Sequence, residues 1–188
     1  MTATHYSFTN LFAWAEKYNI PEHNFPRDRE KLVRMETLVL VGLGIKSLPK
    51  EIALLKNLKT VLLGYNELQT LPQELFGLES LEHLCIQGNK IEYIGDNIVQ
   101  LTNLRTLHAF DNKIKFISPK IIQLKNLEDL TLYNNAFSEL AYKTYLELEY
   151  PKDLHVSFQA PMPSKELQEL SFMLADQFLP QNTQQLEV

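Results

Sequence analysis

Apolar residues recur along this chain with a fixed period of 23 positions. Five units each begin with an apolar residue, at Met35, Leu58, Leu81, Leu104 and Leu127. Within the units, positions 1, 4, 6, 11, 14, 18 and 21 are apolar in four complete copies, and the fifth copy keeps the pattern as far as Leu140. With 45% hydrophobic residues in the whole chain, chance does not give so complete a match, so the period indicates a repeating structure.

Each unit predicts one short strand followed by a turn. The apolar residues at positions 4 and 6 alternate with others, and a period of two is that of a strand with one buried face. Position 9 carries asparagine in four units, at Asn66, Asn89, Asn112 and Asn135. A buried asparagine amide has two donors and an acceptor, so stacked copies can bridge the backbones of neighbouring coils as a ladder.

The second half of each unit predicts the return of the chain on the outer side. Leu48-Pro49 and Leu71-Pro72 place a proline where strand pairing must end. Gly95 and Ser118 replace this proline in units three and four, which predicts a looser return there. Leu43 replaces the ladder asparagine in the first unit, which predicts a repeat at the edge.

With these motifs in place, the sequence from Met35 to about Leu140 resembles the leucine-rich repeat family in its 23-residue form. This form is similar to small bacterial repeat proteins and to the Ras-suppressor-like group. The resemblance implies an α/β fold class, a right-handed leucine-rich-repeat solenoid with a curved parallel sheet on its concave side and helical caps at both ends. It also implies that the concave sheet binds proteins, which is the property that the family shares.

A solenoid exposes its core at both ends unless it is capped, so we expect three segments. These are a helical N-terminal cap at 1–34, the repeats at 35–149, and a degenerate last strand with a C-terminal capping helix and short tail at 150–188. Leu11, Trp14 and Tyr18 have the spacing of one helical face. Residues 153–158 alternate like a sixth strand, shifted by one residue from strict register. Ser164 can cap a helix that is either a lid on the last repeat or a partner-binding helix.

Composition and charge narrow the class of protein further. The 188 residues carry 18 Lys and Arg against 23 Asp and Glu, a net charge of −5, which disfavours binding to nucleic acid or to an anionic membrane surface. A single cysteine, Cys85, excludes an internal disulfide and a four-cysteine zinc site. We identify no signal peptide or transmembrane segment and expect a cytoplasmic protein, with export by a signal-independent route as the alternative.

The surface available for binding consists of positions 3, 5, 7 and 8 of each unit, which point to the concave side and include no Lys or Arg. The predicted partner-binding residues are Leu62, Tyr65, His83, Cys85, Gln87, Thr106, His108, Phe110, Asp129, Thr131 and Tyr133. Aromatic and aliphatic side chains among hydroxyls and imidazoles are typical of a protein-binding patch. For Val39, Val41 and Leu62 the alternative is that the N-terminal segment of the same chain covers them.

One cluster on this face suggests chemistry. Cys85 and His108 share position 5 of adjacent units, so parallel strands in register place their Cα atoms about 4.8 Å apart. With His83 they form either the start of a nucleophilic dyad or three zinc ligands. An open sheet excludes little water and offers no oxyanion donors, so we expect no catalysis, no metal and no cofactor.

The sequence therefore predicts a non-enzymatic module that binds another protein on its concave sheet, such as a signalling regulator or a bacterial effector. By family resemblance the partner is a small GTPase, a phosphatase, another signalling protein or a host protein. Three alternatives remain open: an enzyme or metal site at Cys85, His108 and His83; a recognition domain related to a larger multidomain enzyme; and a homodimer through the concave face.

Overall fold

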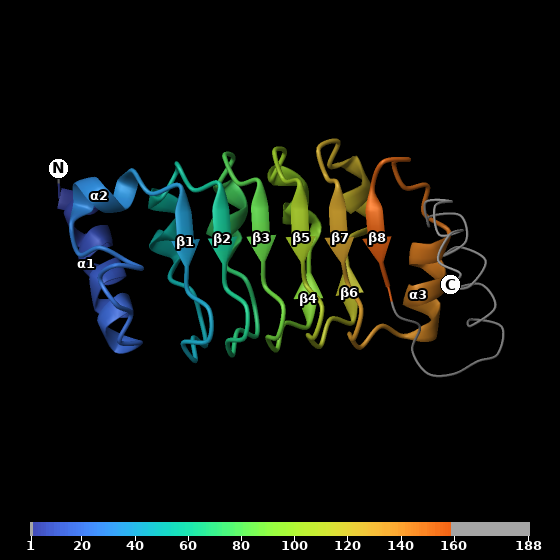
Figure 1. Cartoon of the computed structure of the whole chain (residues 1–188), viewed down its shortest axis with the longest axis horizontal. Helices are drawn as coiled ribbons and strands as arrows, with labels where there is room; N and C mark the ends of the chain where they lie inside the picture. Colours follow the sequence, from blue (N-terminus) through green and yellow to red (C-terminus); the bar gives the residue numbers. More distant parts are fainter. Residues whose placement is uncertain (1, 159–188) are drawn as a thin grey trace, which may run out of the picture.

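The computed structural model describes residues 2–158, and side chains from Phe8 onward. In that part the chain forms successive coils, each with a strand on the same side, so the strands stand next to one another in chain order (Figure 1). The main strands are β1 (Thr37–Val39), β2 (Thr60–Leu62), β3 (His83–Cys85), β5 (Thr106–His108), β7 (Asp129–Thr131) and β8 (His155–Ser157). The predicted helix after Ser164 and the tail lie outside the described residues.

These strands form one parallel sheet in the order β1-β2-β3-β5-β7-β8. From β1 to β7 each residue pairs with the residue 23 positions later, as Leu38 does with Val61 and Leu84 with Leu107. The sequence period is therefore the length of one coil. The predicted α/β leucine-rich-repeat architecture is confirmed.

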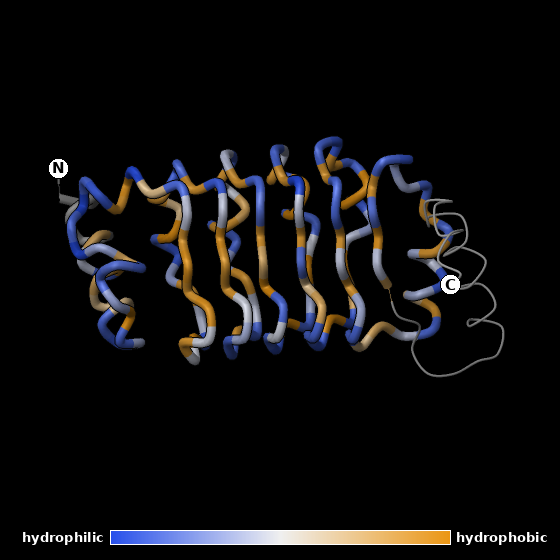
Figure 2. The backbone as a smooth tube through the Cα atoms, in the orientation of Figure 1, coloured by the Kyte–Doolittle hydropathy of each residue, from blue (hydrophilic) through white to orange (hydrophobic). Residues whose placement is uncertain are grey.

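The outer side of the coils consists of short 3-10 helices that lie behind the sheet (Figure 1). They are η1 (Lys50–Leu54), η2 (Gln73–Gly77), η3 (Asp96–Gln100) and η4 (Pro119–Gln123). The apolar repeat positions fill the space between the two layers, and Figure 2 shows hydrophobic stretches recurring in every coil. Met35 and Leu71 are only half-buried. Leu140 is exposed, and burial of the remaining repeat positions supplies the hydrophobic stabilisation of the fold.

The position-9 asparagines connect each coil to the one before it. Asn66 and Asn89 are buried, whereas Asn112 and Asn135 are half-buried. The Asn89 Oδ1 atom accepts a hydrogen bond from the Leu68 N–H at 3.0 Å, and its Nδ2 donates to the carbonyls of Leu63 and Ile86 at 2.9 Å. Asn66, Asn112 and Asn135 repeat the pattern in their own coils. Backbone groups that a turn would otherwise leave unpaired inside the core are thus satisfied.

Units three and four do not have the looser return that Gly95 and Ser118 predicted. Instead, β4 (Tyr93–Ile94) and β6 (Phe116–Ile117) form a second, two-stranded parallel sheet. The Ser118 N–H donates to the Ile94 carbonyl at 2.8 Å, and the Ser118 hydroxyl donates to the Asp96 carboxylate at 2.6 Å. A proline at this position has no N–H to donate. Serine in place of the proline therefore allows an additional hydrogen bond between the two coils.

Two helices precede the first coil, α1 (Thr2–Lys17) and α2 (Arg29–Val33). Leu11 and Trp14 of α1 are buried, and the Trp14 indole N–H donates to the Ser47 carbonyl at 2.8 Å. The Tyr18 hydroxyl accepts a hydrogen bond from the Lys46 N–H at 3.2 Å. These contacts hold α1 against the open end of the first coil.

The last coil differs from the prediction because it contains a true α-helix, α3 (Glu139–Leu146). Ser138 caps it, and Tyr145 inserts its hydroxyl between the backbone N–H and carbonyl of Ile117, at 3.0 and 2.7 Å. Leu140, expected in the core, lies on the outer side of α3 and is 77% exposed, because the helix turns Tyr142 and Tyr145 inward in its place.

The α3 helix also lengthens the last coil. Asp129 pairs with His155, 26 residues later, so β8 lies three residues beyond strict register rather than the single residue predicted. The predicted shift of one residue and the observed shift of three residues are both odd. Because side chains alternate along a strand, both shifts turn the same residues of β8 toward the core.

We expect Asn89→Leu to lower the free energy of unfolding by about 2–4 kcal/mol, because it leaves the Leu68 N–H and the Leu63 carbonyl buried without partners. Urea unfolding followed by circular dichroism measures the loss. The control is Asn103→Leu at an exposed position, where Nδ2 donates to the Glu79 carbonyl, and it should cost less than about 1 kcal/mol. Equal losses in both variants would contradict a role of burial in the ladder.

Ser118→Pro restores the repeat pattern, yet we expect it to destabilise the chain by about 1–3 kcal/mol. The φ of Ser118 is −58°, which proline adopts, so the loss comes from the N–H and the hydroxyl and not from backbone strain. Ser118→Ala keeps the N–H and should lose less in the same unfolding experiment. A more stable Ser118→Pro variant would show that the second sheet contributes nothing.

Candidate protein-binding surface

The sheet face consists of the outward side chains of the six-stranded sheet and of the turn that follows each strand. Burial alternates along the strands, with the central residue inward and its neighbours outward. Ten of the eleven predicted contact residues on this face are half-buried, and Tyr65 is 57% exposed. Val39 and Val41 are 38% and 44% exposed, which contradicts the alternative that the N-terminal segment covers them.

Tyr65 has an unusual backbone conformation. Position 8 of every unit is left-handed, and it carries Gly42, Tyr65, Gly88, Asp111 and Asn134. Glycine, asparagine and aspartate tolerate this region, whereas a bulky residue there is an outlier that costs free energy. The Tyr65 φ is 57°, and its ring lies so close to Gly88 that a Cβ on Gly88 would be 2.6 Å from a ring carbon.

The turns after β5 and β7 carry a pair of stacked aromatic rings, Phe110 and Tyr133. The rings of Phe110 and Tyr133 stack with their centroids 4.6 Å apart and their planes 13° apart, and the His108 ring lies 6.5 Å from Phe110. Both aromatic residues are at position 7, so the register of the sheet brings them together. The sequence predicted both residues for this face, but it did not predict their stacking.

A row of polar side-chain contacts, from Cys85 through His108 and Asp129 to His155, crosses the strands beside these rings. The Cys85 Sγ lies 3.7 Å from His108 Nδ1, and the Asp129 carboxylate lies 3.0 Å from His108 Nε2 and 3.1 Å from His155 Nδ1. His83 does not join this row of polar contacts, because its Nδ1 lies 3.1 Å from the Thr106 hydroxyl instead. Cys85 and His108 are therefore neighbours, as predicted. Their contacts with Asp129 and His155 were not predicted from the sequence.

The surroundings of Cys85 raise the pKa of its thiol and so disfavour a nucleophilic role. Burial raises the pKa of the Cys85 thiol, and the Asp129 carboxylate raises it further. Partial burial also acts to raise the pKa of Asp129, but hydrogen bonds from His108 and His155 outweigh it and hold that pKa below its usual value. A protonated thiol is a poor nucleophile and a poor metal ligand. Within residues 2–158, no group of three His, Cys, Asp or Glu side chains is arranged to hold a metal ion.

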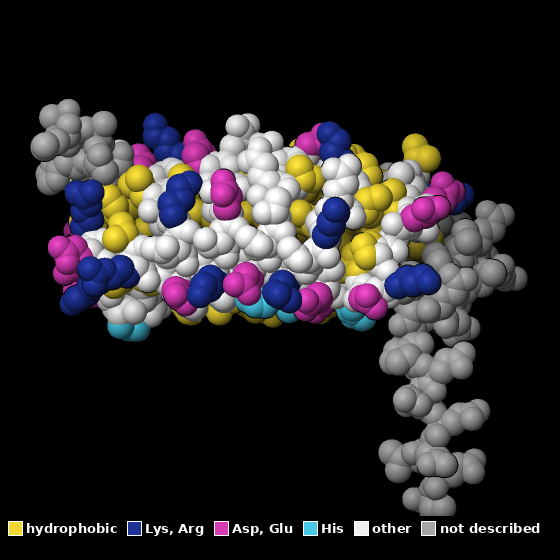
Figure 3. Space-filling model, turned by 90° about the horizontal axis from the view of Figure 1, so that it is seen from above, with side chains coloured by type: hydrophobic (Ala, Val, Ile, Leu, Met, Phe, Trp, Pro, Cys, Tyr) yellow, Lys and Arg dark blue, Asp and Glu magenta, His cyan; other side chains and the backbone are white. Residues whose placement is uncertain are grey.

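Charged side chains lie on the edge where the strands begin. Position 2 alternates in sign through Glu36, Lys59, Glu82, Arg105 and Glu128. Lys59 pairs with Glu36 at 3.0 Å, and Arg105 pairs with Glu82 at 3.6 Å and with Glu128. Figure 3 shows basic and acidic side chains alternating along an edge with histidines beside them. Exposed pairs contribute about 0–1 kcal/mol each, so this edge adds little to the stability of the fold.

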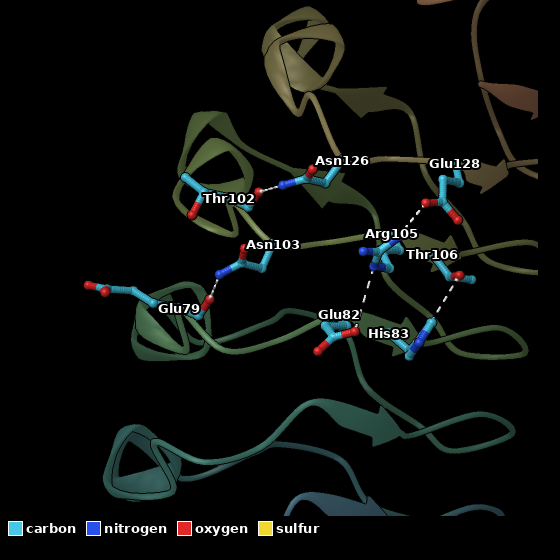
Figure 4. A network of polar contacts seen from close by, with 9 residues as sticks. All are labelled: Glu79, Glu82, His83, Thr102, Asn103, Arg105, Thr106, Asn126 and Glu128. Atoms are coloured by element: carbon cyan, nitrogen blue, oxygen red, sulfur yellow. Dashed lines mark hydrogen bonds and ion pairs between the residues drawn. The ribbon is translucent and has the colours of Figure 1, made fainter. Parts of the chain in front are cut away.

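A hollow of about 370 Å³ opens along this edge. Its lining consists of Lys59, Ser80, Glu82, Asn103, Arg105 and Asn126. Asn103 and Asn126 belong to an outer asparagine ladder that the sequence analysis missed, in which each Nδ2 donates to a carbonyl of the preceding coil at 2.8 Å (Figure 4). Ser80 replaces the asparagine at the hollow. Both cations there already have carboxylate partners, so the hollow is no site for a free anion.

A family model and solved structures agree on the fold. A family model for a leucine-rich repeat region matches residues 15–177. Internalin C2 of Listeria monocytogenes is 29% identical over 68% of this chain and 53% of its own, with a TM-score of 0.57. A leucine-rich repeat protein of Leptospira interrogans is 31% identical over 63% of this chain and 31% of its own, with a TM-score of 0.50. The leucine-rich repeat ectodomain of the receptor kinase SOBIR1 from Arabidopsis thaliana is 25% identical over 64% and 67%, with a TM-score of 0.52.

The chain spans about half of the internalin chain and about a third of the Leptospira chain. No curated protein matches it. Within the described part of the chain, no helix has the length and apolar character needed to cross a membrane.

We expect Cys85 to react with iodoacetamide more slowly in the folded chain than in the urea-unfolded chain, because its raised pKa keeps the thiol protonated near neutral pH. The alkylation rate of the folded chain should rise about tenfold per pH unit between pH 6.5 and pH 8.5, without reaching a plateau. The upper limit of this range is about the ordinary pKa of a cysteine thiol. Mass spectrometry measures the rates. A plateau below pH 7 that His108→Ala abolishes would instead establish an activated dyad.

Proposed function

Because the chain belongs to the leucine-rich repeat family, we propose that it is a non-catalytic module that binds another protein on its sheet face. The observation that carries the proposal is the aromatic and aliphatic surface formed by Val39, Val41, Tyr65, Phe110 and Tyr133, which no described segment of the chain covers. Large side chains of this kind supply most of the binding energy in protein interfaces. Repeat proteins use such continuous open surfaces for recognition.

Tyr65 gives independent support. A left-handed tyrosine costs stability that a glycine or asparagine at the same position would not. The ring contributes little to the core, because the side chain is mostly exposed. A role in contact with a partner accounts for a bulky residue at this position.

The finer identity of the partner stays a prediction. A small GTPase, a phosphatase, another signalling protein or a host protein is consistent with the resemblance, and so is a cytoplasmic location or signal-independent export. We favour a module acting in recognition over the Cys85 alternative, because the raised thiol pKa disfavours both nucleophilic attack and metal binding.

The chain offers a matched pair of variants to test the sheet face. Phe110→Ala with Tyr133→Ala removes one stacked aromatic pair from this face, and we expect it to reduce capture of a partner from native or host lysate at least tenfold. Tyr93→Ala with Phe116→Ala removes an equivalent pair, with centroids 5.0 Å apart, from the two-stranded sheet and should leave capture unchanged. Quantitative mass spectrometry of the captured proteins provides the measurement.

Both double variants need the same melting temperature as the parent within a few degrees for the comparison to hold. Loss of capture only in the Tyr93 and Phe116 variant would move the binding surface to the second sheet. Equal capture by all three chains would overturn the sheet-face proposal.

A further inference from the structure

The far end of the sheet face combines an aromatic surface with an acid. Phe110 and Tyr133 stack in parallel, and Asp111 and Asn134 follow them directly in the two turns. The Asn134 amide donates to one carboxylate oxygen of Asp111. Asp111 is half-buried, its φ is 54°, and no Lys or Arg among the described residues pairs with it. The carboxylate is therefore held in place while its charge stays uncompensated.

The distribution of cations strengthens this asymmetry. The edge acids Glu36, Glu82 and Glu128 each pair with a Lys or Arg of a neighbouring coil. In contrast, the outward positions 3, 5, 7 and 8 between Thr37 and Asn134 carry no Lys or Arg, and their formal charges at neutral pH come from Asp111 and Asp129. A partner that presents a cation is therefore complementary in charge to this face, and one that presents an acid is not.

We propose that the Phe110, Tyr133 and Asp111 group binds an arginine side chain of the partner protein. The planar guanidinium stacks on an outer face of the Phe110 and Tyr133 pair and donates hydrogen bonds to the Asp111 carboxylate. Arginine fits better than lysine because its flat, weakly hydrated cation both stacks on aromatic faces and donates several N–H bonds at once. The proposal rests on the proposed function, since it names the chemistry that the partner brings to the same face.

Among the side chains that the structure describes, from Phe8 to Phe158, no Lys or Arg pairs with Asp111. Lys113 is two residues after Asp111, at an exposed position, and forms no ion pair with it. The His108 ring adjoins Phe110, but its Nε2 is engaged by Asp129. No described side chain supplies the cation, and the proposal assigns it to the partner protein.

The test uses the whole chain, labelled with ¹⁵N, and Nα-acetyl-L-arginine amide as the probe. We expect saturable amide shifts at residues 110–111 and 133–134. The citrulline analogue has the same shape without the charge and should bind at least fivefold more weakly. Asp111→Asn should weaken arginine binding by up to about fivefold, the upper end of the range for one exposed ion pair. Asp153→Asn is the matched control at an exposed acid of the last coil and should change nothing.

Indistinguishable shifts with arginine and citrulline would overturn the proposal, as would arginine shifts confined to the edge that carries Glu36, Glu82 and Glu128. Because the titration needs no partner protein, its failure is separable from failure of the proposed function. If the Phe110 and Tyr133 pair is required for capture while the arginine probe does not bind, the face recognises its partner by apolar contact and the arginine site does not exist.

Discussion

The buried asparagine amide at position 9 is the interaction on which the other features of this structure depend. It occupies a turn where the backbone cannot pair with itself, and it bonds that turn to the coil before it. A coil one residue longer would move the amide away from its partners and would turn the strand residues to the wrong face. From β1 to β7 each coil has 23 residues, and positions 23 apart in the sequence become neighbours in space. Lys59 and Glu36, Phe110 and Tyr133, and Cys85 and His108 all meet for this reason.

The same constraint explains how much of the molecule its sequence predicts. Strands, core and outward positions follow from one period, because each coil repeats the same backbone. The prediction fails where a coil has a different length or a different outer segment. Nothing in the apolar pattern distinguishes Leu140 from a core residue, and only Ser138 as a helix cap, with Tyr142 and Tyr145 spaced by three, indicates α3. At the end of the second sheet, the Ser118 N–H supplies a hydrogen bond to Ile94 that the repeat's usual proline would lack.

The candidate site divides in the same way. The contact between Cys85 and His108 follows from the period, since both occupy position 5. The contact between Asp129 and His155 crosses the 26-residue coil, so a fixed period of 23 cannot find it. The stacking of Phe110 on Tyr133 depends on side-chain rotation, which the spacing leaves open. The outer asparagines were identifiable, because Asn57, Asn103 and Asn126 share the last position of their units.

Separation of roles within each coil is what allows this fold to carry a binding surface. The inward positions and the ladder hold the coil, so the outward positions are free to vary without loss of the core. On this chain the cations Lys59 and Arg105 of the strand-entry edge pair with neighbouring acids, whereas the sheet face carries aromatic rings and the Asp111 carboxylate, which pairs with no described Lys or Arg. An ion-paired edge has little net field, whereas an uncompensated acid beside stacked rings attracts a cation at short range. In the proposed complex the far end of the sheet, around Asp111, orients the partner, rather than the charged edge.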